Sequence, residues 1–151
     1  MLLYHRVAEL ASDPQCLAVS PARFADHLDV IRRHGLPVSL ADLVDRSQRE
    51  AVPAGAVAVT FDDGYADNLT TALPLLAAAD VPATVMVSTL PLAHGREFWW
   101  DELERRLLGA GTLPQRLCLT VDGRPAEWDL TGADKWTAAD AARFSSWTVM
   151  E

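Results

Sequence analysis

The segment from Val57 to Phe61 is apolar or β-forming throughout and ends directly at two adjacent acids, Asp62 and Asp63. Residues of this kind favour a buried strand, and the strand then carries both carboxylates to its C-terminal end, where α/β sheets bind ligands. Two neighbouring carboxylates repel each other, so that one stays ionised only when a cation lies against it. The pattern therefore predicts an α/β fold with a metal site at one edge of the sheet.

The acidic pair also has other interpretations, namely a simple turn or a phosphate-handling site. Asp and Gly are common in turns, but Asp62, Asp63 and Gly64 follow an apolar strand that opens a strand–helix–strand unit, which favours a functional site. The chain has neither the glycine-rich loop of phosphate-loop hydrolases nor a Gly-x-Ser-x-Gly sequence. Phosphatases with a nucleophilic aspartate normally separate their two acids by one residue, so a magnesium-dependent phosphohydrolase is the weaker alternative.

The N-terminal part of the chain predicts one strand followed by a helix. Leu2 to Tyr4 is a short apolar strand, and residues 7–19 form a loop. Ser20 caps a helix, Pro21 suits its first turn, and Gly35 ends it. The expected buried stripe of this helix consists of Phe24, Leu28 and Ile31.

Two further helices and a second strand complete the predicted core. Ser39 can cap a short helix, and residues 48–55 form a surface connection. After the acidic pair a helix starts near Ala66, and Pro74 either kinks it or delays its start. A strand over residues 83–87 then lies parallel to the central strand. The inward-facing residues expected on the two helices are Leu40, Leu43 and Val44 on the first and Leu69, Leu73 and Leu76 on the second.

From Pro91 onward the pattern is that of an excursion from the α/β core. A helix over residues 101–108 has its inward-facing residues at Leu103 and Leu107. Residues 116–121 and 125–129 flank Asp122-Gly123, which predicts a β-hairpin. A last short helix is expected after Thr137.

Composition excludes several partners. The chain has 151 residues and a net charge of −8, which argues against binding to nucleic acids or anionic membranes. No apolar run approaches the length of about 18 residues needed for a membrane span, and the first residues do not form a signal peptide, so we expect a cytoplasmic protein. Cys16 and Cys118 are expected to be reduced, partly buried thiols, with a disulfide between them as the alternative.

Two segments carry a resemblance to a known family. Residues 60–65, Thr-Phe-Asp-Asp-Gly-Tyr, resemble the first motif of the polysaccharide deacetylases, carbohydrate esterases that remove N-acetyl groups from chitin, peptidoglycan or poly-N-acetylglucosamine. Residues 3–7, Leu-Tyr-His-Arg-Val, and the stretch over 19–43 are similar to one bacterial branch of this family. The resemblance covers residues 1–108.

The resemblance implies a fold, a metal and roles for individual residues. It implies a (β/α) barrel that binds a divalent cation, usually zinc, through one aspartate and two histidines. Asp62 would be the general base and Asp63 the metal ligand, while His5 and Tyr65 would bind an N-acetylated polysaccharide or oligosaccharide. The metal would polarise the acetamide carbonyl and acidify a water whose proton Asp62 removes.

His5 and the other histidines have further interpretations. His5 ends the first strand, which would place it at the same mouth of the barrel as Asp62, and the alternative is a hydrogen-bonded histidine at a strand end. The family's His-x-x-x-His motif is absent, and His94 alone follows the acidic pair. His27 and His34 lie seven residues apart on a predicted helix, as surface residues rather than ligands.

The number of strands predicts an incomplete domain. Three or four core strands are fewer than the seven or eight that such a barrel needs. We therefore expect residues 1–151 to be a single truncated catalytic domain: an incomplete (β/α) barrel with its core at 1–90 and an insertion-like segment of helix and β-hairpin at 91–151. We expect impaired deacetylase activity, and the alternative is a non-catalytic fragment that associates through an open sheet edge.

Overall fold

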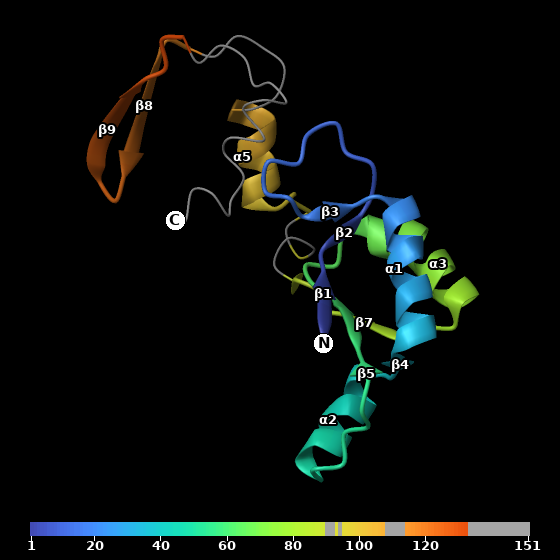
Figure 1. Cartoon of the computed structure of the whole chain (residues 1–151). Helices are drawn as coiled ribbons and strands as arrows, with labels where there is room; N and C mark the ends of the chain where they lie inside the picture. The colour runs from blue at the N-terminus through green and yellow to red at the C-terminus, as the bar shows by residue number, and fades with distance from the viewer. Residues whose placement is uncertain (90–92, 94, 108–113, 133–151) are drawn as a thin grey trace. The chain divides into compact units, whose positions relative to one another are not determined.

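The computed structural model describes residues 1–89, 93, 95–107 and 114–132 (Figure 1). The chain consists of two compact units, Met1–Ala93 and His94–Glu151, which are described separately below. The helix expected after Thr137 lies outside the described residues. That both units belong to one catalytic domain stays a prediction.

A three-stranded parallel sheet forms the centre of the first unit. Its strands are β1 (Leu2–Tyr4), β6 (Val59–Phe61) and β7 (Ala83–Val85), in the order β1-β6-β7. Tyr4 pairs with Phe61, and Phe61 pairs with Val85, so the three strands end level with one another. The predicted parallel pairing of the strands on either side of the acidic pair is confirmed.

Four shorter strands form two parallel pairs. β2 (Arg6–Val7) pairs with β3 (Ala18–Val19), so two strands lie where the sequence predicted a loop. β4 (Leu36–Pro37) pairs with β5 (Ala56–Val57), and Ala58 separates β5 from β6. The fold is mixed α/β, and within the described residues these strands do not form a closed sheet.

Helix α1 (Pro21–His34) is the one that the sequence predicts, with the same ends. The hydroxyl of Ser20 accepts a hydrogen bond from the Arg23 amide, which satisfies one of the free N–H groups of the first turn. The Gly35 amide donates to Ile31 O at the other end, 2.9 Å away. The buried residues of α1 are Phe24, Leu28 and Ile31, as predicted.

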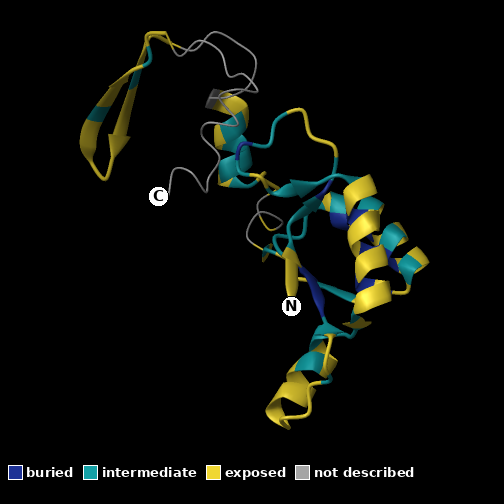
Figure 2. Cartoon of the chain, in the orientation of Figure 1, coloured by how far each residue is buried: buried dark blue, intermediate teal, exposed yellow. Residues whose placement is uncertain are grey.

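Helix α2 (Leu40–Gln48) has the predicted cap but only part of the predicted burial. Ser39 Oγ accepts from the Asp42 amide at 3.0 Å. Val44, expected to face inward, is exposed, whereas Leu40 and Leu43 are half-buried, and no residue of α2 is fully buried. In Figures 1 and 2, α2 extends away from the sheet and from α1, which agrees with its incomplete burial.

The core of the first unit is built around three aromatic rings. Tyr4 meets Phe24 edge-on at 5.1 Å between ring centroids and stacks on Phe61 at 5.6 Å, while Phe24 and Phe61 are 5.8 Å apart. Phe24 and Phe61 are fully buried. Burial raises the pKa of Tyr4, whose hydroxyl lies 3.1 Å from Nδ1 of His27. The core therefore reaches the sheet edge at which β1 and β6 end.

The helix that follows the acidic pair contains a π-helical turn, which changes the face that it buries. Segment η1 (Asn68–Ala72) precedes α3 (Leu73–Ala79), and the Leu73 amide donates to Asn68 O, five residues back. This wider turn shifts the buried stripe by one residue and precedes Pro74, which has no N–H for the preceding turn. The stripe is Asn68, Ala72 and Leu76, so the predicted burial of Leu69 and Leu73 is wrong.

The shifted stripe can be tested with the same substitution at two leucines. Leu76 is 6% exposed and Leu69 is 68% exposed. We expect Leu76→Ala to lower the free energy of unfolding by about 2–5 kcal/mol, and Leu69→Ala by less than about 0.5 kcal/mol. Urea unfolding followed by circular dichroism measures both. A larger loss for Leu69→Ala would show that the helix is a regular α-helix from its start.

The second unit contains a helix and a hairpin. Helix α5 (Trp99–Leu107) and strands β8 (Arg116–Val121) and β9 (Arg124–Asp129) are its described elements. β8 and β9 pair antiparallel as predicted. Asp122 and Gly123 both have positive φ, 51° and 75°, as a two-residue hairpin turn requires.

Two expectations about side chains outside the core are wrong. Leu103 on α5 is exposed, and the side chain of Leu107 lies outside the described residues. Cys16 and Cys118 are free, as expected, but both are exposed rather than partly buried. Cys16 has a left-handed backbone (φ 54°) in the loop before β3, and Cys118 lies on an uncovered face of the hairpin.

The described part of the chain contains no helix that is both long and apolar enough to cross a membrane. The cytoplasmic location stays a prediction.

Candidate active site

The acidic pair forms a tight reversal at the end of β6. The Asp62 amide donates to Tyr4 O at 2.9 Å, which extends the pairing of β6 with β1 by one residue. The Gly64 amide then donates back to Asp62 O, also at 2.9 Å. Both acids are half-buried. The predicted position of the two carboxylates, at the carboxyl edge of a parallel sheet, is therefore the observed one.

The backbone of this reversal is unusual. Asp63 and Gly64 have φ values of 69° and 76°, and this left-handed region is uncommon for a residue with a side chain. The Ser88 amide, which follows β7, holds Asp63 by donating to its carbonyl oxygen at 3.2 Å. Outliers of this kind concentrate at functional sites. The segment after β7 thus helps to fix the acidic turn.

His5 and Tyr65 lie at the same edge as the two acids. His5 directly follows β1, and its carbonyl oxygen accepts a hydrogen bond from Nδ2 of Asn68 at 2.9 Å. Tyr65 follows the acidic turn, and the guanidinium carbon of Arg6 lies 4.4 Å from the centre of its ring. The structure therefore brings together the segments that carry all four predicted site residues.

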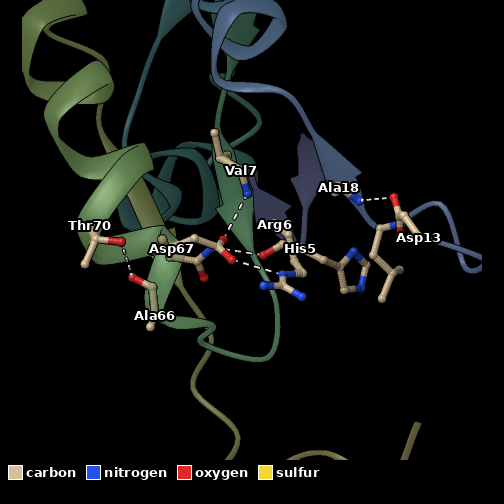
Figure 3. A network of polar contacts seen from close by, with 10 residues as sticks. His5, Arg6, Val7, Asp13, Ala18, Ala66, Asp67 and Thr70 are labelled. Carbon is tan, nitrogen blue, oxygen red and sulfur yellow. Dashed lines mark hydrogen bonds and ion pairs between the residues drawn. The ribbon is translucent and has the colours of Figure 1, made fainter. Parts of the chain in front are cut away.

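A carboxylate that the sequence did not single out joins these two segments. Asp67 accepts hydrogen bonds from Nε of Arg6 at 2.9 Å and from the Val7 amide at 3.0 Å (Figure 3). Arg6 and Asp67 are 61 positions apart. One indirect signal is visible in the sequence: Asp67 and Asn68 are two polar residues at the start of a helix, directly after the acidic turn.

Asn68 has a fixed amide orientation. Its Nδ2 donates to His5 O and lies 3.4 Å from Oδ1 of Asp67, so the opposite orientation would place Oδ1 against two acceptors. Oδ1 is buried and accepts no hydrogen bond from the residues that the structure describes. An unsatisfied acceptor of this kind costs about 1–3 kcal/mol, which the bonds made by Nδ2 help to offset.

An apolar groove of about 560 Å³ begins beside the acidic turn. Gly64 and Tyr65 form its end nearest the turn, whereas Asp62 and Asp63 do not line it. The rest of its lining combines buried residues such as Leu76 and Val81 with four large exposed side chains: Leu69, Leu73, Val85 and Val87. The groove therefore explains where the exposed leucines point, but it is not the acidic site itself.

The described residues do not fit a zinc ion. Zinc sites use three or four protein ligands, and the described part of the chain contains no group of three His, Cys, Asp or Glu side chains that could hold a metal. His27 contacts Tyr4 from α1, and His94 lies outside the described residues. Asp63 is the ligand that the sequence predicts, and the structure places no group of three possible metal ligands around it within the described residues.

Comparison with known proteins identifies the N-terminal part. Residues 49–107, which include the acidic turn, match the family described as polysaccharide deacetylase. Over 82 residues the chain is 32% identical to a poly-beta-1,6-N-acetyl-D-glucosamine N-deacetylase of Escherichia coli strain K12. This match covers 53% of the chain but 12% of that relative. The chain thus spans a small part of the relative that it matches.

Solved structures of similar fold also match the chain. IcaB from Ammonifex degensii matches with a TM-score of 0.52 and 28% identity, over 69% of this chain and 46% of that one. The Streptococcus pyogenes deacetylase PplD matches with a TM-score of 0.54 and 24% identity, over 69% of this chain and 49% of that one, which supports the fold alone. Residues 49–107 thus match the polysaccharide deacetylase family, and the relatives described above support the family that the motif at residues 60–65 resembles.

Proposed function

We propose that this chain carries the acidic part of a metal-dependent site that hydrolyses the N-acetyl amide of an amino-sugar polymer. Asp62 is the general base, Asp63 is a metal ligand, and His5 and Tyr65 contact the sugar. The observation that carries this proposal is the acidic turn at the end of the middle strand, with His5 and Tyr65 at the same edge. The family assignment and the name of the Escherichia coli relative support the choice of substrate.

Amide hydrolysis needs a general base that is accessible to water. In amide hydrolysis, water adds to the acetyl carbon and loses a proton, and the C–N bond breaks to give acetate and a free amine. Asp62 is a half-buried residue at the edge of the sheet, so it is not sealed from water, and a positioned carboxylate is a suitable general base. Tyr65 combines a flat apolar ring with a hydroxyl group, the combination that suits a sugar ring with its polar substituents.

We also propose that the parallel strands β1, β6 and β7 are part of a (β/α) barrel. Their equal ends and parallel register match the arrangement in which such barrels carry their active sites at the carboxyl edge. The likeness in fold to PplD, named a deacetylase, supports this proposal.

Because the described residues do not fit zinc, we propose that the 151-residue chain alone is inactive or nearly so. The sequence has no two histidines separated by three residues, and Asp62 and Asp63 alone are too few ligands. The proposed activity needs further metal ligands in addition to the described residues.

The proposal predicts sugar binding without turnover. The purified chain is titrated with a β-1,6-linked N-acetylglucosamine tetramer in NMR experiments, and acetate release is measured with and without added Zn²⁺. We expect resonance shifts at His5 and Tyr65, weaker binding in Tyr65→Leu, and no acetate release. Asp45→Asn is the matched control, because Asp45 pairs with Arg49 at 2.8 Å on exposed α2.

Three outcomes would contradict parts of this proposal. Acetate release that Asp63→Ala abolishes would show that the chain is active on its own. Absence of shifts at His5 and Tyr65, together with oligomers in size-exclusion chromatography, would favour a fragment that associates through the exposed residues at the end of β7, Val85 to Val87. Magnesium-dependent cleavage of a generic phosphate ester would favour the phosphohydrolase alternative.

A further inference from the structure

The carboxylate of Asp67 makes several polar contacts at the carboxyl edge of the sheet. Its side chain is 12% exposed, and its Oδ2 accepts from Nε of Arg6, whose side chain is 25% exposed. Its Oδ1 accepts from the Val7 amide and lies 3.4 Å from Nδ2 of Asn68. Hydrogen bonds to a charged group with little exposure are stronger than those made by exposed ion pairs. Asp67 is therefore a structural link rather than a solvated surface acid.

The contacts of Asp67 join the two segments that follow the neighbouring strands β1 and β6. Arg6 and Val7 form β2, directly after β1, whereas Asp67 and Asn68 start the helix that follows β6 and the acidic turn. Asn68 adds a fourth bond through its Nδ2 to His5 O. These contacts connect the segment that carries His5 to the segment that follows the acidic turn, at the carboxyl edge of the sheet (Figure 3).

Arg6 contacts both Asp67 and Tyr65 and so connects the two residues. The guanidinium is planar, so its Nε–H can bind Asp67 while its face lies over an aromatic ring. Here the Arg6 guanidinium carbon is 4.4 Å from the centre of the Tyr65 ring. Asp67 fixes the plane of Arg6, and that plane forms one side of the surroundings of Tyr65.

We infer that Asp67 is a positioning residue of the candidate active site, acting on Tyr65 through Arg6 and on His5 through β2 and Asn68. The role of Tyr65 and His5 as sugar contacts rests on the proposed function. The link that Asp67 makes is measurable without it, and the experiment below keeps the two apart.

The test replaces Asp67 with asparagine, which keeps the size and removes the charge. An asparagine oxygen can accept from Arg6 or from Val7, but its NH₂ group then faces the other donor. In Asp67→Asn we expect hydrogen exchange of the Val7 amide to become about tenfold faster, or the Nε–H resonance of Arg6, which lies near the Tyr65 ring, to disappear. The amides of Leu2 and Asp62, which donate to backbone carbonyls, keep their exchange rates, and Asp45→Asn changes none of these signals.

Sugar affinity gives a second readout that a general loss of stability does not produce. At a temperature where all variants are folded, we expect the affinity for the β-1,6-linked N-acetylglucosamine tetramer to fall about tenfold in Asp67→Asn, the equivalent of about one charge-assisted hydrogen bond. Arg6→Lys should lose a similar factor while keeping slow exchange at Val7, because lysine keeps the charge but has no flat face.

Two results would overturn the inference. One is unchanged Val7 and Arg6 signals in Asp67→Asn, and the other is unchanged tetramer affinity despite altered signals. If the wild-type chain does not bind the tetramer, the proposed function fails, and the Val7 and Arg6 signals alone decide whether Asp67 positions Tyr65 and the segment of His5.

Discussion

Replacing Phe61 with alanine is expected to lower the free energy of unfolding of the first unit by about 3–5 kcal/mol. Phe61 is fully buried and is the last residue of the middle strand. Its ring contacts both Tyr4 and Phe24, so its removal leaves a cavity between β1, β6 and α1. Domains are stable by about 5–15 kcal/mol, which makes this loss a large share of the total.

The measurement is urea unfolding followed by circular dichroism. Phe61→Leu keeps part of the volume and should lose less, in the order expected for a cavity of graded size. Val44→Ala is the control for truncation of an exposed apolar side chain and should change stability by less than about 0.5 kcal/mol. A loss below about 1 kcal/mol for Phe61→Ala would show that the three rings do not form the core.

The parts of the fold that depend on neighbouring residues in the sequence could be predicted from it. The ends of α1, the start of α2 and the β-hairpin all follow from residues that satisfy free backbone groups or allow positive φ, such as Ser20, Ser39 and Asp122-Gly123. The middle strand could be predicted because each of its residues is buried. These features depend on neighbours in the sequence, which periodicity and capping describe.

Predictions failed where a neighbour in space decided the outcome. Leu69 and Leu73 have regular helical spacing, but the π-helical turn before Pro74 moves the stripe by one residue. Val44 and Leu103 also have helical spacing, yet both side chains are exposed. An amphipathic pattern states which side could be buried and does not state whether anything packs there.

The same distinction applies to the candidate site. Asp62 and Asp63 could be placed from sequence because a strand fixes where its end lies, and the structure puts His5 at the same edge. The bonds that Asp67 makes to Arg6 and Val7 could not be predicted, because they join segments about 60 positions apart and depend on the pairing of β1 with β6. The acids could thus be found from sequence, but not the residues that hold the site together.

Gly64→Ala is expected to destabilise the first unit by about 2–4 kcal/mol, because two effects add at this position. Gly64 has a φ of 76°, a conformation that costs a residue with a Cβ about 1–2 kcal/mol. An added Cβ would also lie 3.1 Å from Cγ1 and 3.2 Å from Cα of Val87. The valine side chain can rotate, but its Cα cannot move without shifting the segment that follows β7.

Gly55→Ala separates these two effects. Gly55 has nearly the same φ, 78°, but an added Cβ there has no atom within 4 Å, so only the cost of about 1–2 kcal/mol for the backbone should appear. Urea unfolding gives the difference between the two variants. Exchange of the Ser88 amide, which donates to Asp63 O, should become faster in Gly64→Ala and stay unchanged in Gly55→Ala. Equal losses of stability in the two variants would show that Val87 does not press on the acidic turn, and that the segment after β7 is free to move away from the site.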